Sequence, residues 1–150
     1  MVANNPDAVF RMERDIDLGL LNGMNLDFKG VLDGNGYMLS NIRIGGLGNV
    51  NAGLFSTATN ATFRNIRIVN ANIQGKGTYT GTLAGRSTGV LFDRVHISGN
   101  MFVRGMNNTG GLTGYAINTT FLDCRVDGQI AVTGNSYVGG LAGYATGLSI

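Results

Sequence analysis

The side chains of this chain that could bind a charged ligand recur at one position of a repeated strand pattern. Each lies between two apolar residues, as in Ile-Arg-Ile and Val-His-Ile. The positions are Asp17, Arg43, Arg67, His96 and Arg125. Stacked copies of the strand would place them in one ladder, which is mostly basic. Arginine binds carboxylate and sulfate groups through paired hydrogen bonds, so the ladder predicts contact with an acidic glycan. The alternative is a solvated face whose charge is balanced by acidic neighbours, namely Asp93, Asp123 and Asp127.

Two pairs of tyrosines form a second candidate site. Tyr115 and Tyr144 are 29 residues apart, and each follows a Gly-Leu motif. Tyr79 and Tyr137 are separated by twice that spacing. Exposed, stacked tyrosines offer flat apolar rings with polar tips, which would suit a sugar ligand. The alternative is that the rings only stack on one another to stabilise the repeat.

The remaining polar motifs favour structural roles. Asp33-Gly34-Asn35-Gly36 is similar to a calcium-binding loop but lacks the acidic ligands that would follow, so we expect a tight turn. No pair of carboxylates recurs on one strand, which glycan cleavage would require. The single cysteine, Cys124, shares a column with Ile66 and Val95 and is expected in the core. We therefore expect no enzymatic activity, no cofactor and no metal.

The elements that position these residues follow from an internal repeat. Four leucines lie 29 residues apart, namely Leu54, Leu83, Leu112 and Leu141. A column of Phe63, Phe92 and Phe121 has the same period. Upstream, Asn41–Ile44 matches Asn65–Ile68 at an offset of 24, and Asp15–Leu18 matches Asn41–Ile44 at an offset of 26. These matches predict shorter steps in the first coils and place Arg43 in register with Arg67.

Alternation of apolar and polar residues in each repeat predicts strands, and the segments between them are rich in Gly, Asn, Thr and Ser, which form turns. Glycine accounts for 25 of 150 residues, against one proline and 13% charged residues. This composition excludes a disordered chain, a collagen and a helical bundle. One repeat cannot bury its own apolar face, but stacked repeats can. We predict a single-stranded, right-handed parallel β-helix of about five coils of 24–29 residues, forming one domain over residues 1–150.

The segment Phe28–Ile44, with its Leu-Asp-Gly-Asn-Gly stretch, and the motifs Gly111–Gly114 and Gly140–Gly143 resemble the GLUG-repeat family. The resemblance covers about residues 9–150. It implies a large bacterial protein that is secreted or anchored at the cell surface, such as an adhesin-like protein or an immunoglobulin-A-cleaving metallopeptidase. The His-Glu-x-x-His zinc motif of those peptidases has no counterpart here, so the resemblance does not imply peptidase activity.

These observations predict a structural, adhesive module: a rigid piece of a longer solenoid at the bacterial surface or outside the cell, whose side face contacts a glycan or protein of a host or neighbouring cell. One alternative is a β-helix that binds or degrades glycans. A second is a filament unit that associates end to end through open coil edges. The net charge of +2 argues against a nucleic-acid partner, and no apolar run is long enough for membrane insertion.

Overall fold

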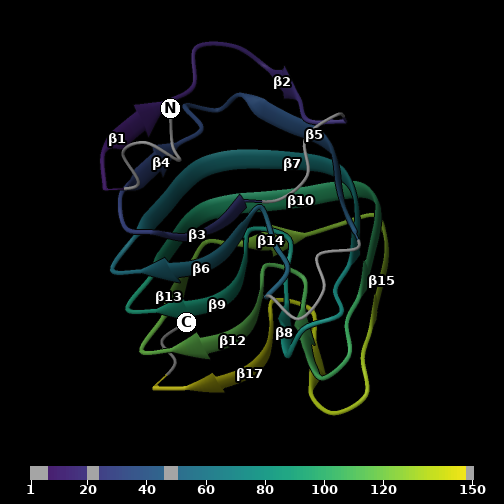
Figure 1. The fold of residues 1–150 in the computed structure, drawn as a ribbon. Coiled ribbons are helices and arrows are strands. Elements are labelled where there is room, and N and C mark those ends of the chain that lie inside the picture. Colours follow the sequence, from purple (N-terminus) through teal and green to yellow (C-terminus); the bar gives the residue numbers. More distant parts are fainter. Residues whose placement is uncertain (1–6, 20–23, 46–50, 148–150) are drawn as a thin grey trace.

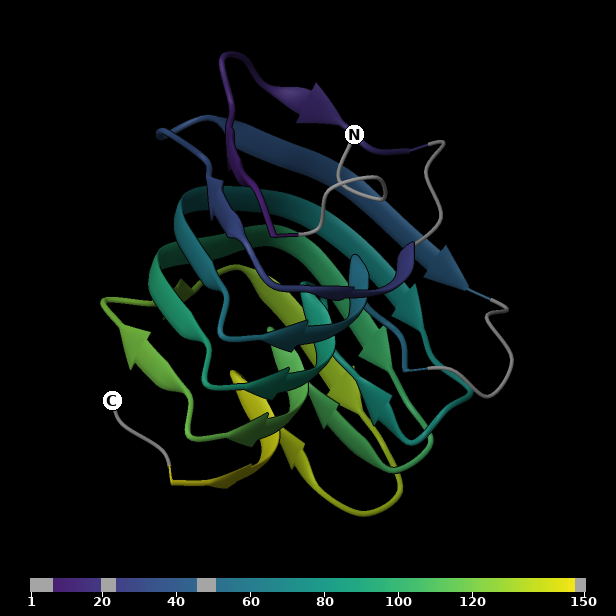
Figure 2. The ribbon, with the colours of Figure 1, turned by 60° about the vertical axis from the view of Figure 1, so that its left-hand side comes forward.

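The strand pairings in the computed structural model are parallel, and successive passes of the chain stack as a parallel β-helix (Figure 1). The structure describes residues 7–19, 24–45 and 51–147. The chain passes through up to three sheets in each coil, as Figure 2 shows from another side. The predicted fold class is therefore confirmed.

The largest sheet has nine strands. Its main path contains β1 (Val9–Arg11), β4 (Val31–Asp33), β7 (Thr62–Gln74), β10 (Leu91–Arg104) and β13 (Thr120–Leu122). Beside this path lie β2 (Ile16–Asp17), β5 (Met38–Gly45), β14 (Arg125–Val126) and β15 (Gln129–Thr133). Strands β7 and β10 are long because the chain continues through two successive pairing segments without leaving the sheet.

Two smaller sheets complete the coils. The five-stranded sheet contains β3 (Met24–Phe28), β6 (Phe55–Thr59), β9 (Ala84–Thr88), β12 (Thr113–Ile117) and β17 (Ala142–Thr146). The three-stranded sheet contains β8 (Tyr79–Thr80), β11 (Asn108–Gly110) and β16 (Val138–Gly139). The path through the nine-stranded sheet and the five-stranded sheet each pass through five layers, in agreement with the predicted number of coils.

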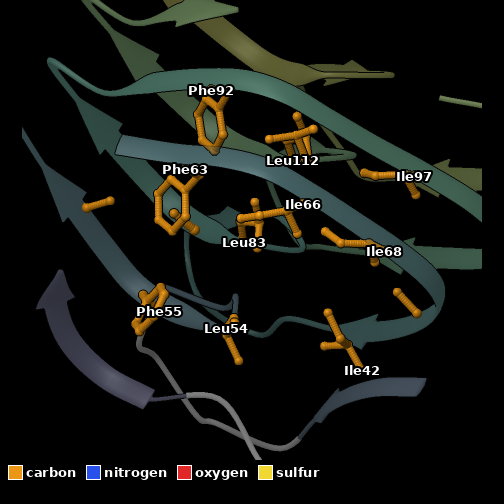
Figure 3. Packing of buried hydrophobic residues seen from close by; sticks show 14 of the residues in the cluster. Ile42, Leu54, Phe55, Phe63, Ile66, Ile68, Leu83, Phe92, Ile97 and Leu112 are labelled. Carbon is orange, nitrogen blue, oxygen red and sulfur yellow. The ribbon is translucent and has the colours of Figure 1, made fainter. Parts of the chain in front are cut away.

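The 29-residue period sets the register of the later coils. Phe92 pairs with Phe63 on one side and with Phe121 on the other. Their rings stack with centroids 5.3 Å and 5.0 Å apart. Leu83 and Leu112 are also fully buried in the same core (Figure 3). Burying identical side chains above one another is therefore what fixes the register, because a shift by one residue would turn the apolar set outward.

The shorter offsets predicted for the first coils are wrong. Arg43 pairs with Asn72, so the segment Asn41–Ile44 is in register with Asn70–Ile73, at an offset of 29. Asp17 pairs with Ser40 rather than with Arg43. The Asn-Ile-Arg-Ile sequence misled the alignment because similar short segments occupy two different places in a coil. In each place an asparagine with positive φ precedes an inward-facing strand residue.

Residues with positive φ form three columns, each at a spacing of 29 residues. The columns are Gly36, Asn65, Arg94 and Asp123; Asn41, Asn70, Gly99 and Gly128; and Asn60, Gly89, Asn118 and Gly147. Glycine and asparagine are the residues that adopt this left-handed conformation most readily. This finding confirms that the polar residues before the strand are turn residues, and it leaves Arg94, with φ of 54°, as the unfavourable member.

Substituting Arg94 by Asn should stabilise the chain by about 0.5–1 kcal/mol, because asparagine relieves the left-handed strain. The change removes the ion pair with Asp93, but Arg94 is 57% exposed and such pairs contribute little. Urea unfolding measures the difference. Arg67→Asn is the matched control, because Arg67 lies in strand β7 and is not among the residues with positive φ. Equal or lower stability of Arg94→Asn would contradict the strain.

Candidate functional site

The basic ladder exists, but it is shorter than predicted. Arg67, His96 and Arg125 lie in register on β7, β10 and β14. Arg43 lies outside this ladder because it pairs with Asn72, and Asp17 lies outside because it pairs with Ser40. The prediction that all five residues share one ladder is therefore wrong for these two, since their coils are in a different register from the one that the motif match implied.

An acidic side chain divides the remaining ladder. Asp127 Oδ2 lies 3.0 Å from His96 Nε2 and 2.9 Å from Arg125 Nε. The carboxylate occupies donors that an external anion would need and offsets the positive charge. The expected role of Asp127 as a balancing charge is thus confirmed, whereas Asp93 instead holds Arg94 through two contacts of 3.0 Å. The geometry favours a solvated, internally paired face at this position.

The Asp33–Gly36 segment forms the expected tight turn. The Asn35 backbone N–H donates to Asp33 Oδ1 at 2.8 Å, and the Tyr37 N–H donates to the Gly34 carbonyl at 2.8 Å. Burial raises the pKa of Asp33, but the Asn35 N–H and the Arg64 guanidinium outweigh it, so the pKa lies below its usual value. The carboxylate is therefore committed to the turn and to Arg64, which is 3.2 Å away. Among the described residues, no three His, Cys, Asp or Glu side chains are grouped to hold a metal ion.

Cys124 packs against the core but is only partly buried. Its Sγ donates to the Phe92 carbonyl oxygen at 3.2 Å. Burial raises the pKa of this thiol, which disfavours the reactive thiolate. This environment agrees with the structural role predicted from its column.

The tyrosines converge on one surface, which we call the tyrosine cluster: Tyr79, Tyr115, Tyr137 and Tyr144, with Arg86. Tyr115 lies on β12 and pairs with Arg86 of β9 on one side and Tyr144 of β17 on the other. Tyr79 begins β8 of the three-stranded sheet, and Tyr137 directly precedes β16. Side chains from two sheets therefore meet along the edge where these sheets approach each other.

The rings of the cluster form a continuous aromatic surface. Tyr115 is 5.1 Å from Tyr79 and 5.4 Å from Tyr144 between ring centroids. Tyr137 and Tyr144 are 4.7 Å apart and tilted by 53°. Tyr115 is partly buried, while Tyr137 is 53% and Tyr144 38% exposed. The cluster thus has an inner ring that supports it and two outer rings that face solvent.

Arg86 is a member of the cluster that the sequence analysis did not identify. Its guanidinium carbon lies 5.9 Å from the centre of the Tyr115 ring, within the range of a cation–π contact. The 29-residue spacing between Arg86 and Tyr115 was a signal that could have revealed it. The arginine adds donors for hydroxyl or carboxylate groups beside the aromatic surface.

In the parts of the chain that the structure describes, no helix is long and apolar enough to cross a membrane. No family model and no curated protein matches this chain. The fold is similar to the crystal structure of a protein from Bacteroides ovatus described as a "putative immunoglobulin A1 protease", with a TM-score of 0.56 and 17% sequence identity.

The match covers 97% of this chain and 59% of the Bacteroides ovatus chain, so the present chain spans about three fifths of that length. At this identity the similarity shows the fold alone. It is consistent with the β-helix that the repeat predicts and leaves the activity of the chain to be argued from its own residues.

Proposed function

We propose that this chain is a rigid, non-catalytic β-helix module of a larger bacterial protein that is secreted or held at the cell surface. Its side face contacts a glycan of a host or neighbouring cell, and adhesion is the result. The stacked core supports this role, because parallel ladders with fully buried Phe, Ile and Leu columns hold surface side chains in fixed positions. The fold shared with the Bacteroides ovatus protein is compatible with membership in a longer chain.

The tyrosine cluster is the observation that carries the proposal. Aromatic rings on a rigid surface contribute large apolar area at low entropic cost, and their hydroxyl groups bind polar partners. The exposed faces of Tyr137 and Tyr144 suit the flat, C–H-rich side of a sugar ring. Arg86 lies beside the supporting ring of Tyr115 and offers donors to sugar hydroxyl groups.

The test is a retention and cleavage screen of the labelled protein on neutral and acidic polysaccharides. We expect a neutral polysaccharide to retain the protein and to remain at its original length. The double substitution Tyr137→Ser with Tyr144→Ser should lower retention about tenfold, since the exposed rings supply the contact area. Shortened polymer would instead show catalysis and overturn the non-catalytic role.

Tyr37→Ser is the matched control for the cluster variant. Tyr37 is 37% exposed, close to the 38% of Tyr144, and no ring contact joins it to the cluster in the described part of the chain. Retention should be unchanged in this variant. Equal loss in both variants, or no retention of the parent protein on any neutral polysaccharide, would contradict a ligand role for the tyrosine cluster.

A further inference from the structure

A groove crosses the nine-stranded sheet at a place that the basic ladder and the tyrosine cluster do not include. Three adjoining hollows of about 420, 430 and 390 Å³ form it, and each shares lining residues with the next. Asn72, Gln74 and Phe102 line both the first and the second hollow. Gln74 and Arg104 continue into the third. Each hollow lies within the size range of small-ligand sites, roughly 300–1,000 Å³.

Strand register places the groove side chains in rows. Arg43, Asn72 and Phe102 are neighbours on β5, β7 and β10. Gln74 and Arg104 form the next row, two residues further along the strands. Adjacent members of a row are about 4.8 Å apart, the distance between strands. The five side chains are exposed, whereas residues between them, such as Ile73 and Val103, are buried. The groove is therefore built on the outer face of the stacked core.

The groove is positively charged and rich in amides. Its described lining residues include the cationic side chains of Arg43, Lys76 and Arg104 and no aspartate or glutamate. The amide side chains in the first hollow are Asn41, Asn70, Asn72, Gln74 and Asn100. Amides donate and accept hydrogen bonds at the same time, as pairs of sugar hydroxyls do. Guanidinium groups bind carboxylate and sulfate in paired geometry.

Phe102 supplies an apolar surface in the middle of these polar groups. It is 54% exposed although it lies on the same strand as Phe92, which is fully buried. Its neighbour on β15 is Ala131, so the space beside the ring on that side is bounded by a small side chain. An exposed aromatic ring bounded by amides and arginines matches a sugar ring better than it matches an apolar peptide.

We propose that this groove binds an acidic saccharide. Phe102 supports a sugar ring, Asn72 and Gln74 bind its hydroxyl groups, and Arg43 and Arg104 bind its negatively charged groups. A single-stranded nucleic acid would also use basic and aromatic residues, but it would need several rings on which successive bases stack. The lining has one aromatic ring and five amides in its first hollow, which favours the saccharide.

Titration calorimetry with four probes tests the proposal on the full chain. The probes are tetragalacturonate, a heparin-derived tetrasaccharide, neutral galactotetraose and an eight-residue oligothymidylate. We expect saturable binding of at least one acidic tetrasaccharide, at least tenfold weaker binding of galactotetraose, and weaker binding in 0.5 M NaCl. Arg43→Gln and Phe102→Ser should each weaken acidic-saccharide binding about tenfold. Binding of neither acidic probe would overturn the proposal, and tighter binding of oligothymidylate would assign the groove to nucleic acid instead.

Arg14→Gln is the matched control, because it makes the same change of charge at an exposed arginine on an earlier coil. It should leave the affinity within about twofold of the parent protein. Equal loss in Arg14→Gln and Arg43→Gln would show only non-specific attraction and would overturn the site. The Tyr137→Ser, Tyr144→Ser double variant should keep its affinity for the acidic probe, so failure of the tyrosine cluster and failure of the groove are separate outcomes.

Discussion

Replacing Phe92 by alanine should destabilise the chain by about 3–5 kcal/mol, the range observed for aromatic truncation in a packed core. Phe92 is fully buried and stacks between Phe63 and Phe121, so the substitution removes contacts with two coils at once. The neighbouring backbone is held by ladders on both sides and cannot collapse into the cavity. This loss is a large share of the 5–15 kcal/mol that a domain typically has. Equilibrium unfolding in urea, followed by far-ultraviolet circular dichroism, measures it.

Phe102→Ala is the matched control for this prediction. Both residues are phenylalanines on β10, but Phe102 is 54% exposed and faces the groove. Its truncation should change the free energy of unfolding by less than about 1 kcal/mol. If the two variants lost similar stability, the aromatic column would not be the main support of the coils, and the arrangement of the core would have to be reconsidered.

Replacing Gly114 by alanine should lower stability by about 3 kcal/mol or more and should disrupt the contact between the five-stranded and three-stranded sheets. A Cβ atom at this position would lie 2.6 Å from the Asn108 carbonyl oxygen and 2.9 Å from that of Gly85, and it would also press on the Thr80 backbone nitrogen. These are backbone atoms in paired strands, which have no alternative rotamer to adopt. Overpacking of this kind strains the structure from several directions at once. Urea unfolding and the near-ultraviolet signal of the tyrosines measure the effect.

Gly140→Ala tests the same chemical change at another glycine of the repeated Gly-Leu motif. A Cβ atom at Gly140 would meet nothing within 4 Å, and Gly140 is not among the residues with positive φ. We expect a change of less than about 0.5 kcal/mol. Comparable losses in the two variants would mean that the motif needs glycine for backbone conformation rather than for close approach of two sheets.

The contrast between these glycines explains the sequence motif after which the resemblance is named. Gly85, Gly114 and Gly143 occupy one column, and a Cβ atom on any of them would contact backbone atoms of the adjacent sheet. The leucine of the motif points into the core, as the full burial of Leu83 and Leu112 shows. The motif therefore combines one core position with one position where two sheets approach closely, and both requirements are renewed in every coil.

The sequence by itself determined the period, the inward columns and the fold class of this protein. Phe63, Phe92 and Phe121 recur at a constant spacing, and their stacking is recoverable because burial allows only one register. The turn columns were recoverable for a similar reason, since positive φ restricts Asn65 and its equivalents to a few residue types. Packing and backbone conformation leave marks on the sequence wherever each coil repeats the same constraint.

The tertiary structure alone decided which surface side chains meet. Outward-facing residues such as Arg43 and Asp127 are not held by packing, so their pattern does not reveal the register, and the repeated Asn-Ile-Arg-Ile sequence placed Arg43 beside the wrong partner. Tyr79 and Tyr115 approach each other because two sheets meet at an edge, which depends on turn geometry rather than on periodicity. Burial constrains the inner half of each strand in the sequence, whereas the contacts of the outer half follow only once the coils are assembled.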